Sequence, residues 1–111
     1  DEAALSALDA ALKLDDTHAE TWVRRGAIHL RARRRKQAHA DAARAIELEP
    51  LHLGARELLG AALEGMRRPR EALEVYQKML DDNPWKRGLV ARMYKTEQAA
   101  RLDEALRGPM K

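Results

Sequence analysis

The chain has 111 residues, with six Gly, four Pro and no Cys, and its residues are 45% hydrophobic and 35% charged. This length fits one domain, the composition favours a folded, helix-rich protein over a disordered chain, and the absence of Cys excludes disulfides, thiol catalysis and Cys-ligated metals. The net charge of +3 hides an asymmetry, because residues 22–44 alone carry +7, and such a basic segment is typical of proteins with an anionic partner.

The first predicted helix lies within residues 1–18, DEAALSALDAALKLDDTH. This start is acidic where a signal peptide is basic, and no stretch of the sequence approaches the roughly 18 apolar residues of a membrane span. We therefore expect no membrane association and a cytoplasmic location.

Two helix pairs are predicted next, and they are related by a period of 34 residues. The pairs of identical residues at this offset are Gly26 and Gly60, Ala27 and Ala61, Ala38 and Ala72, and Pro50 and Pro84. Apolar residues within each unit recur at helical spacing, and the prolines end the second helices because Pro cannot donate to the helical ladder. The sequence thus predicts one unit at 19–52 and another at 53–86, with TxxE at Thr17 to Glu20 as a capping box for the first helix.

The last segment, residues 87–111, predicts a further first helix over 87–101. The sequence RLDEAL that follows resembles the start of a second helix, and Gly108 with Pro109 would stop any helix. Either this segment caps the stack or the chain is cut from a longer array. Because residues 1–18 resemble the second half of a unit, we expect the cut segment.

These residues resemble the tetratricopeptide repeat family, whose unit is a helix-turn-helix of 34 residues. With Ala19 as position 1, the signature positions of the two units hold Trp22, Gly26, Ala38, Ala45 and Pro50, then Leu59, Gly60, Ala72, Tyr76 and Pro84. The resemblance implies an all-α fold, a right-handed α-solenoid of antiparallel helix pairs. Arg25 departs from the pattern, since it occupies a position that is usually a buried Leu, and we expect that no complete repeat packs in front of it, or that its stem snorkels.

In this family the first helices line a concave groove that binds a peptide or partner helix, so the resemblance implies a non-catalytic interaction module that acts as scaffold or adaptor. The positions that commonly line the groove or its edges hold Glu20, Val23, Arg24, Ala27, Leu30, Arg31, Glu57, Ala61, Glu64, Ala91, Arg92 and Lys95. Small residues run along its middle and charges of both signs flank them. We expect a peptide of mixed polar and apolar character.

Some members of the family capture the C-terminal carboxylates of chaperones with Lys and Asn side chains. The matching positions here hold Val23, Ala27, Leu58, Gly88 and Arg92. Only Arg92 can bind a carboxylate, so the sequence predicts that this chain lacks that clamp.

A basic ridge is the second candidate site. In the repeat register the run RARRRK falls at the turn between two helices, and the 34-residue offset repeats its charges. The ridge consists of Arg33, Arg34, Lys36, Arg67, Arg68, Arg70 and Arg101. Solvated turn surface is the first interpretation, and binding of an acidic partner or nucleic acid is the alternative. Nucleic acid is disfavoured because no aromatic residue is interleaved with the arginines.

Other chemistry finds little support in the sequence. His18 and His52 share a repeat position, but equivalent positions lie two helices apart, too far for one metal ion. No phosphate-binding loop, nucleophile elbow or zinc-protease motif occurs. We expect no catalysis, no cofactor and no metal. Self-association through the ends of the stack, and an adaptor segment within a larger enzyme, are further alternatives.

Overall fold

The computed structural model describes residues 2–108 and contains six α-helices in that range. They are α1 (Glu2–Leu14), α2 (Ala19–Arg31), α3 (Arg35–Leu48), α4 (Leu53–Gly65), α5 (Pro69–Asp82) and α6 (Leu89–Arg107). Within 2–108 no strand occurs, so the predicted all-α fold is confirmed.

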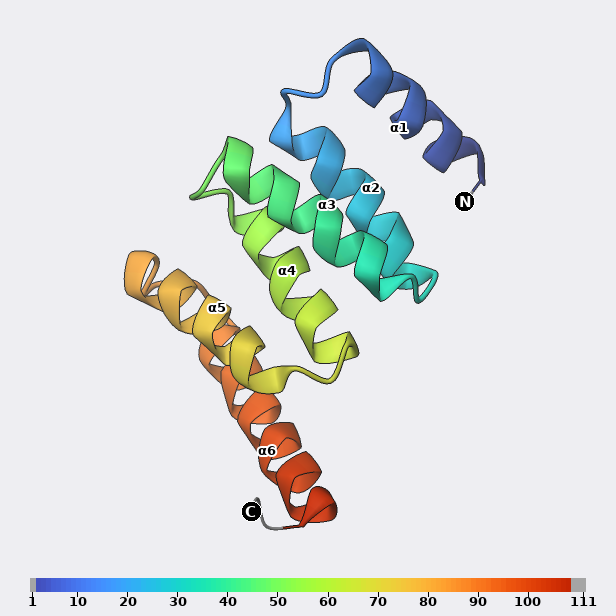
Figure 1. Cartoon of the computed structure of the whole chain (residues 1–111). Coiled ribbons are helices and arrows are strands. Elements are labelled where there is room, and N and C mark those ends of the chain that lie inside the picture. Colours follow the sequence, from blue (N-terminus) through green and yellow to red (C-terminus); the bar gives the residue numbers. More distant parts are fainter. Residues whose placement is uncertain (1, 109–111) are drawn as a thin grey trace.

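Consecutive helices pack against each other along the chain, and α2 also packs against α4. Figure 1 shows the result, an elongated stack of antiparallel helices that runs from α1 to α6. The molecule measures 49 × 30 × 23 Å along its principal axes. This architecture is a helical-repeat solenoid, as the 34-residue period predicts.

Small residues set the distance between the helices. The side chains of Ala38, Ala42, Ala62 and Ala72 are completely buried where neighbouring helices meet. Gly60 lies under the Tyr76 ring, since a Cβ at this position would come within 2.6 Å of the Tyr76 Cζ atom. The helices therefore approach so closely that a single methyl group does not fit.

The two turns that join α2 to α3 and α4 to α5 have the same geometry. Arg33 and Arg67 adopt left-handed backbone conformations, with φ of 64° and 62°. Two backbone hydrogen bonds close each turn. The longer-range bond runs from Arg34 N to His29 O in the first turn and from Arg68 N to Leu63 O in the second, and both measure 2.8 Å. This is the Schellman motif, which usually has Gly at the left-handed position.

Arg25 is not left unpaired, and in the described residues only the single helix α1 precedes its unit. Its Nε and Nη2 donate to the two Oδ atoms of Asp41 at 3.0 and 2.8 Å, and its Nη1 donates to Asp9 of α1 at 3.1 Å. Asp41 is only 3% exposed. At the same positions of the next unit stand Leu59 and Val75, which pack against the core. A buried ion pair thus takes the place of an apolar pair.

Two predictions about helix ends, one for the start of α2 and one for the end of α6, are wrong. Thr17 does not cap α2, because its N–H and its hydroxyl both bond to Asp15 Oδ1 while His18 holds the N-cap position without a side-chain bond. RLDEAL does not start a new helix, since α6 continues unbroken from Leu89 to Arg107. Gly108 follows as the C-cap, and Pro109 lies outside the described residues.

The ion pair predicts a specific pattern of stabilities. Arg25→Leu leaves the Asp41 carboxylate buried without its partner, and we expect it to lower the free energy of unfolding by about 2–4 kcal/mol. Arg25→Leu with Asp41→Val copies the next unit and should return the protein to within about 1 kcal/mol of wild type. Urea unfolding of both variants measures the difference, and a double variant no more stable than the single one contradicts it.

The left-handed turns predict a gain in stability. A non-Gly residue in this conformation costs about 1–2 kcal/mol, which exceeds the entropy cost of Gly. Arg33→Gly and Arg67→Gly should therefore each raise the free energy of unfolding by about 0.5–1 kcal/mol, seen as a higher Tm. Ala32→Gly is the control, because Ala32 has a φ of −86° and should lose stability. Glycine variants at 33 and 67 that melt below wild type would refute this account of the turns.

Candidate functional site

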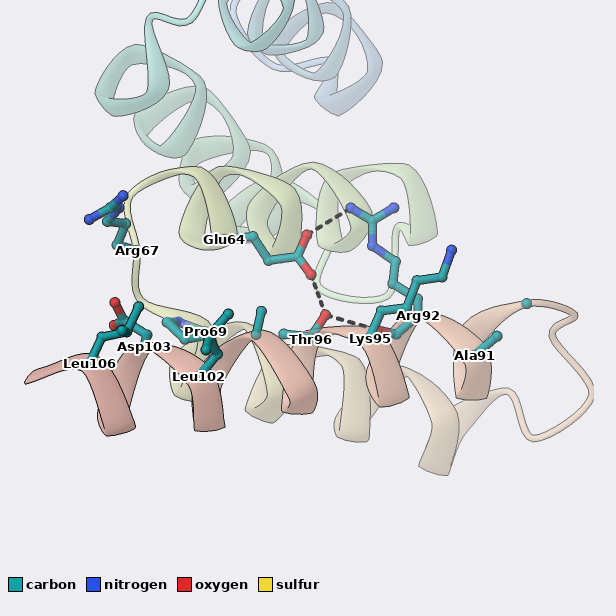
Figure 2. Close-up of a pocket in the computed structure, with 12 residues that line it drawn as sticks. Glu64, Arg67, Pro69, Ala91, Arg92, Lys95, Thr96, Leu102, Asp103 and Leu106 are labelled. Atoms are coloured by element: carbon teal, nitrogen blue, oxygen red, sulfur yellow. Dashed lines mark hydrogen bonds and ion pairs between the residues drawn. The ribbon is translucent and has the colours of Figure 1, made fainter. Parts of the chain in front are cut away.

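A hollow with a volume of about 690 Å³ lies between α4 and α6. Figure 2 shows it bounded by the C-terminal half of α4 on one side and by a full face of α6 on the other. Its lining residues are Glu64, Arg67, Pro69, Gly88, Ala91, Arg92, Lys95, Thr96, Ala99, Leu102, Asp103 and Leu106. We call this hollow the α4–α6 cavity.

One wall of the α4–α6 cavity is a hydrogen-bonded cluster centred on Glu64. This carboxylate accepts from Arg92 Nη2 at 3.0 Å and from the Thr96 hydroxyl, and Thr96 is only 3% exposed. Arg92 Nε also donates to the Tyr76 hydroxyl at 2.9 Å. Burial raises the pKa of Tyr76 to about 12, so this phenol is neutral at physiological pH. These bonds connect α4, α5 and α6, as the dashed lines from Glu64 in Figure 2 show in part.

Much of the remaining lining of the α4–α6 cavity is apolar and uncovered. Ala91, Ala99, Leu102 and Leu106 follow one face of α6 at helical spacing. Leu102 is 61% exposed and Leu106 79%. Burying such side chains against a partner would be favourable by roughly 1.5–3 kcal/mol each.

Of the charged side chains that line the α4–α6 cavity, the acidic ones have partners and two of the basic ones do not. Both carboxylates are paired, Glu64 as above and Asp103 with Arg107 at 2.8 Å. The side chains of Arg67 and Lys95 make no hydrogen bond or ion pair within residues 2–108. The unsatisfied charge in the cavity is therefore positive.

Only predicted groove residues from the C-terminal part of the chain lie together in the α4–α6 cavity. Four of the predicted groove residues, Glu64, Ala91, Arg92 and Lys95, line the α4–α6 cavity. Val23 and Leu30 are half-buried and pack against the core, and Ala27 and Ala61 are also half-buried. The roles of all these residues in binding remain predictions.

Three charged groove residues of α2 and α4, Glu20, Arg24 and Glu57, make ion pairs with described residues. Glu20 pairs with Arg24 at 3.2 Å and with His52 Nε2 at 3.1 Å. The His52 Nδ1 accepts from the backbone N–H of Ala55, so this ring caps α4 and its Nε2 donates to Glu20. Lys86 reaches back to Glu57 at 2.8 Å. Predicted edge residue Arg31 is exposed and makes no ion pair with the described residues.

Sequence reasoning missed the second half of the α4–α6 cavity, which Thr96, Ala99, Leu102, Asp103 and Leu106 line. The register of the repeat predicts that this helix ends near residue 101, which would have removed Leu102, Asp103 and Leu106 from the groove. A signal against this helix end exists, because no Gly or Pro occurs between Gly88 and Gly108. Because α6 is unbroken, the lining extends to Leu106.

The basic ridge is divided by the structure into paired and unpaired cations. Arg68 pairs with Glu71, Arg70 donates to Glu104 at 2.8 Å, and Arg101 donates to Glu97 at 3.1 Å. Hydrogen bonding to Arg101 lowers the pKa of Glu97, so this carboxylate stays charged. Arg34 donates to His29 Nδ1 at 2.9 Å. The remaining ridge cations are Arg33, Lys36 and Arg67, which are exposed and have no ion-pair partner within 2–108.

Metal and membrane sites find no support in residues 2–108. No group of three or more His, Asp or Glu side chains there is placed to hold a metal ion. None of the described helices combines the length and the hydropathy needed to cross a bilayer.

Comparison with known proteins points to one repeat family, although no protein-family model matches the chain. The small glutamine-rich tetratricopeptide repeat-containing protein 2 of Saccharomyces cerevisiae is 32% identical over 111 residues, which cover 95% of this chain and 32% of that protein. The chain thus spans about a third of the length of this curated relative.

Solved structures share the fold at low sequence identity. The first TPR of Spaghetti (RPAP3), bound to the HSP90 peptide SRMEEVD, has a TM-score of 0.80 at 20% identity and covers 86% of this chain and 77% of that chain. The second TPR domain of human RPAP3, in complex with the HSP70 peptide SGPTIEEVD, has a TM-score of 0.78 at 19% identity and covers 84% of this chain and 78% of that chain.

Proposed function

We propose that this chain, which belongs to the tetratricopeptide repeat family, is a non-catalytic protein–protein interaction module that binds a peptide or partner helix in the α4–α6 cavity. The observation that carries the proposal is the uncovered apolar face of α6 in a hollow of about 690 Å³. Two similar folds are bound to peptides in their solved structures. Recruitment of a partner in this way suits a scaffold or adaptor.

The length of the α4–α6 cavity fits a short peptide. Its lining extends along α6 from Gly88 to Leu106, which at 1.5 Å per residue is about 27 Å. An extended chain advances about 3.3 Å per residue, so about eight residues would follow this path. Apolar side chains of the ligand would cover Leu102 and Leu106 and supply most of the affinity.

The polar residues of the α4–α6 cavity would orient the ligand. Arg92 and Thr96 are held in place by Glu64, so they form a fixed polar wall. Lys95 is free to pair with a carboxylate of the ligand. A peptide with apolar residues and at least one acidic residue therefore fits better than a basic one.

Filling the α4–α6 cavity tests the proposal. Ala99 is exposed and lines the cavity, so Ala99→Trp should occupy its volume without disturbing the core. Peptides selected by display on the wild-type chain should bind this variant at least tenfold more weakly, because the indole takes the space of a ligand side chain. Fluorescence anisotropy measures the affinity.

Ala105→Trp is the matched control. Ala105 belongs to the same helix and is also exposed, but it does not line the cavity. It should bind the selected peptides as tightly as wild type. Selected peptides that bind Ala99→Trp and wild type with equal affinity would show that the ligand lies elsewhere.

The chain should not capture the chaperone peptide of its structural relative. At the positions of the carboxylate clamp, Val23 is half-buried and Leu58 is buried, and neither side chain is polar. Ala27 and Gly88 also lack a polar side chain. The Arg92 side chain is already bonded to Glu64 and Tyr76. A charge-assisted hydrogen bond contributes about 1.5–3 kcal/mol, so the loss of several should leave a Kd of about 1 mM or weaker for SRMEEVD. Isothermal titration with that peptide measures this, and a micromolar Kd would contradict it.

A further inference from the structure

We propose that the unpaired cations around the α2–α3 turn, together with Arg67, form a docking surface for an acidic segment of a protein partner. We call this surface the cationic edge, and its residues are Arg31, Arg33, Arg35, Lys36 and Arg67. All five side chains are exposed, and none makes an ion pair within residues 2–108. The proposal does not rest on peptide binding in the α4–α6 cavity.

The members of the cationic edge come together from two turns. Arg33 and Arg67 occupy the same left-handed position of the α2–α3 and α4–α5 turns. A Cβ on Gly65 would lie 2.7 Å from Arg35 Cδ, so the start of α3 lies directly against the end of α4. Figure 1 shows both turns on the same side of the stack, and Figure 2 shows Arg67 extending from the second turn without a partner.

The neighbouring arginines of the basic ridge, unlike those of the cationic edge, have ion-pair partners. Arg68, Arg70 and Arg101 are bonded to the carboxylates of Glu71, Glu97 and Glu104. Acidic residues of α5 and α6 therefore neutralise one end of the basic ridge and leave the other end positive. A ligand carboxylate at the cationic edge would displace only water and counterions, whereas at the paired arginines it would compete with an existing ion pair.

The backbone supplies an independent argument. Arg in a left-handed conformation costs about 1–2 kcal/mol, and this happens at both turns of the cationic edge. Gly would make the same turn without that penalty. Two side chains that stability alone would disfavour, both exposed and both cationic, point to a role in binding.

The chemistry of the cationic edge fits carboxylates better than nucleic acid. Recognition of single-stranded nucleic acid combines cations with aromatic rings that stack on bases. The edge contains no aromatic residue, and Trp22 and Tyr76 lie under other arginines or in the core. Arg side chains bind carboxylates with paired, planar hydrogen bonds. A run of Glu or Asp residues is therefore the expected ligand.

A labelled peptide of ten Glu residues is the probe for this surface. We expect the wild-type chain to bind it in fluorescence anisotropy at low salt, with an affinity that falls as salt is added. The variant Arg31→Gln, Arg33→Gly, Lys36→Gln should bind about tenfold more weakly, since each exposed pair contributes up to about 1 kcal/mol. Arg33→Gly keeps the turn conformation favourable, and a thermal melt of the variant verifies that it is folded.

The control variant removes the same charge elsewhere. Lys13, Lys78 and Arg87 are exposed cations that make no ion pair within 2–108, and Lys13→Gln, Lys78→Gln, Arg87→Gln should bind the probe as wild type does. Equal losses in the two triple variants would overturn the proposal, because they would show an effect of net charge alone. No binding by wild type, or tighter binding of a ten-nucleotide single-stranded DNA than of the peptide, would also overturn it.

Discussion

The close approach of the helices at Gly26 and Gly60 is the constraint on which the rest of the structure depends. A Cβ on Gly26 would lie 2.5 Å from Leu58 Cδ2 of the next unit, and one on Gly60 would overlap the Tyr76 ring. Buried Ala residues such as Ala38 and Ala72 continue these contacts. Side chains of neighbouring helices fill the space directly over these glycines, so the first two units leave no volume for a cavity at this level.

The cavity appears where this constraint ends. The last unit has Tyr94 at the position of the two glycines, and its ring is 66% exposed. Side-chain bonds from Glu64 to Arg92 and Thr96 link α4 to α6 in place of close backbone packing. The unbroken length of α6 then presents Leu102 and Leu106 to the gap. The proposed binding site and the loss of close packing thus have the same cause.

The sequence predicted the repeat and most of its helices because Gly, Ala and Pro recur at fixed positions for steric reasons. It missed the Arg25–Asp41 pair, although the substitution of both residues by Leu59 and Val75 in the next unit is visible at the 34-residue offset. The predicted end of α6 near residue 101 was also too early. That prediction followed the repeat register, although no Gly or Pro occurs there to end the helix. The division of the ridge could not be predicted, since it depends on which carboxylates of α6 reach Arg70.

Chemical-shift mapping of the ¹⁵N-labelled chain with a peptide selected on the wild type tests the central claim most directly. If the α4–α6 cavity binds the ligand, the largest shifts should fall on Ala91, Lys95, Ala99 and Leu102, with smaller ones on Glu64 across the cavity. The amides of α1 and α3 should not move. Shifts confined to α1 and α3, with α6 unchanged, would contradict the account.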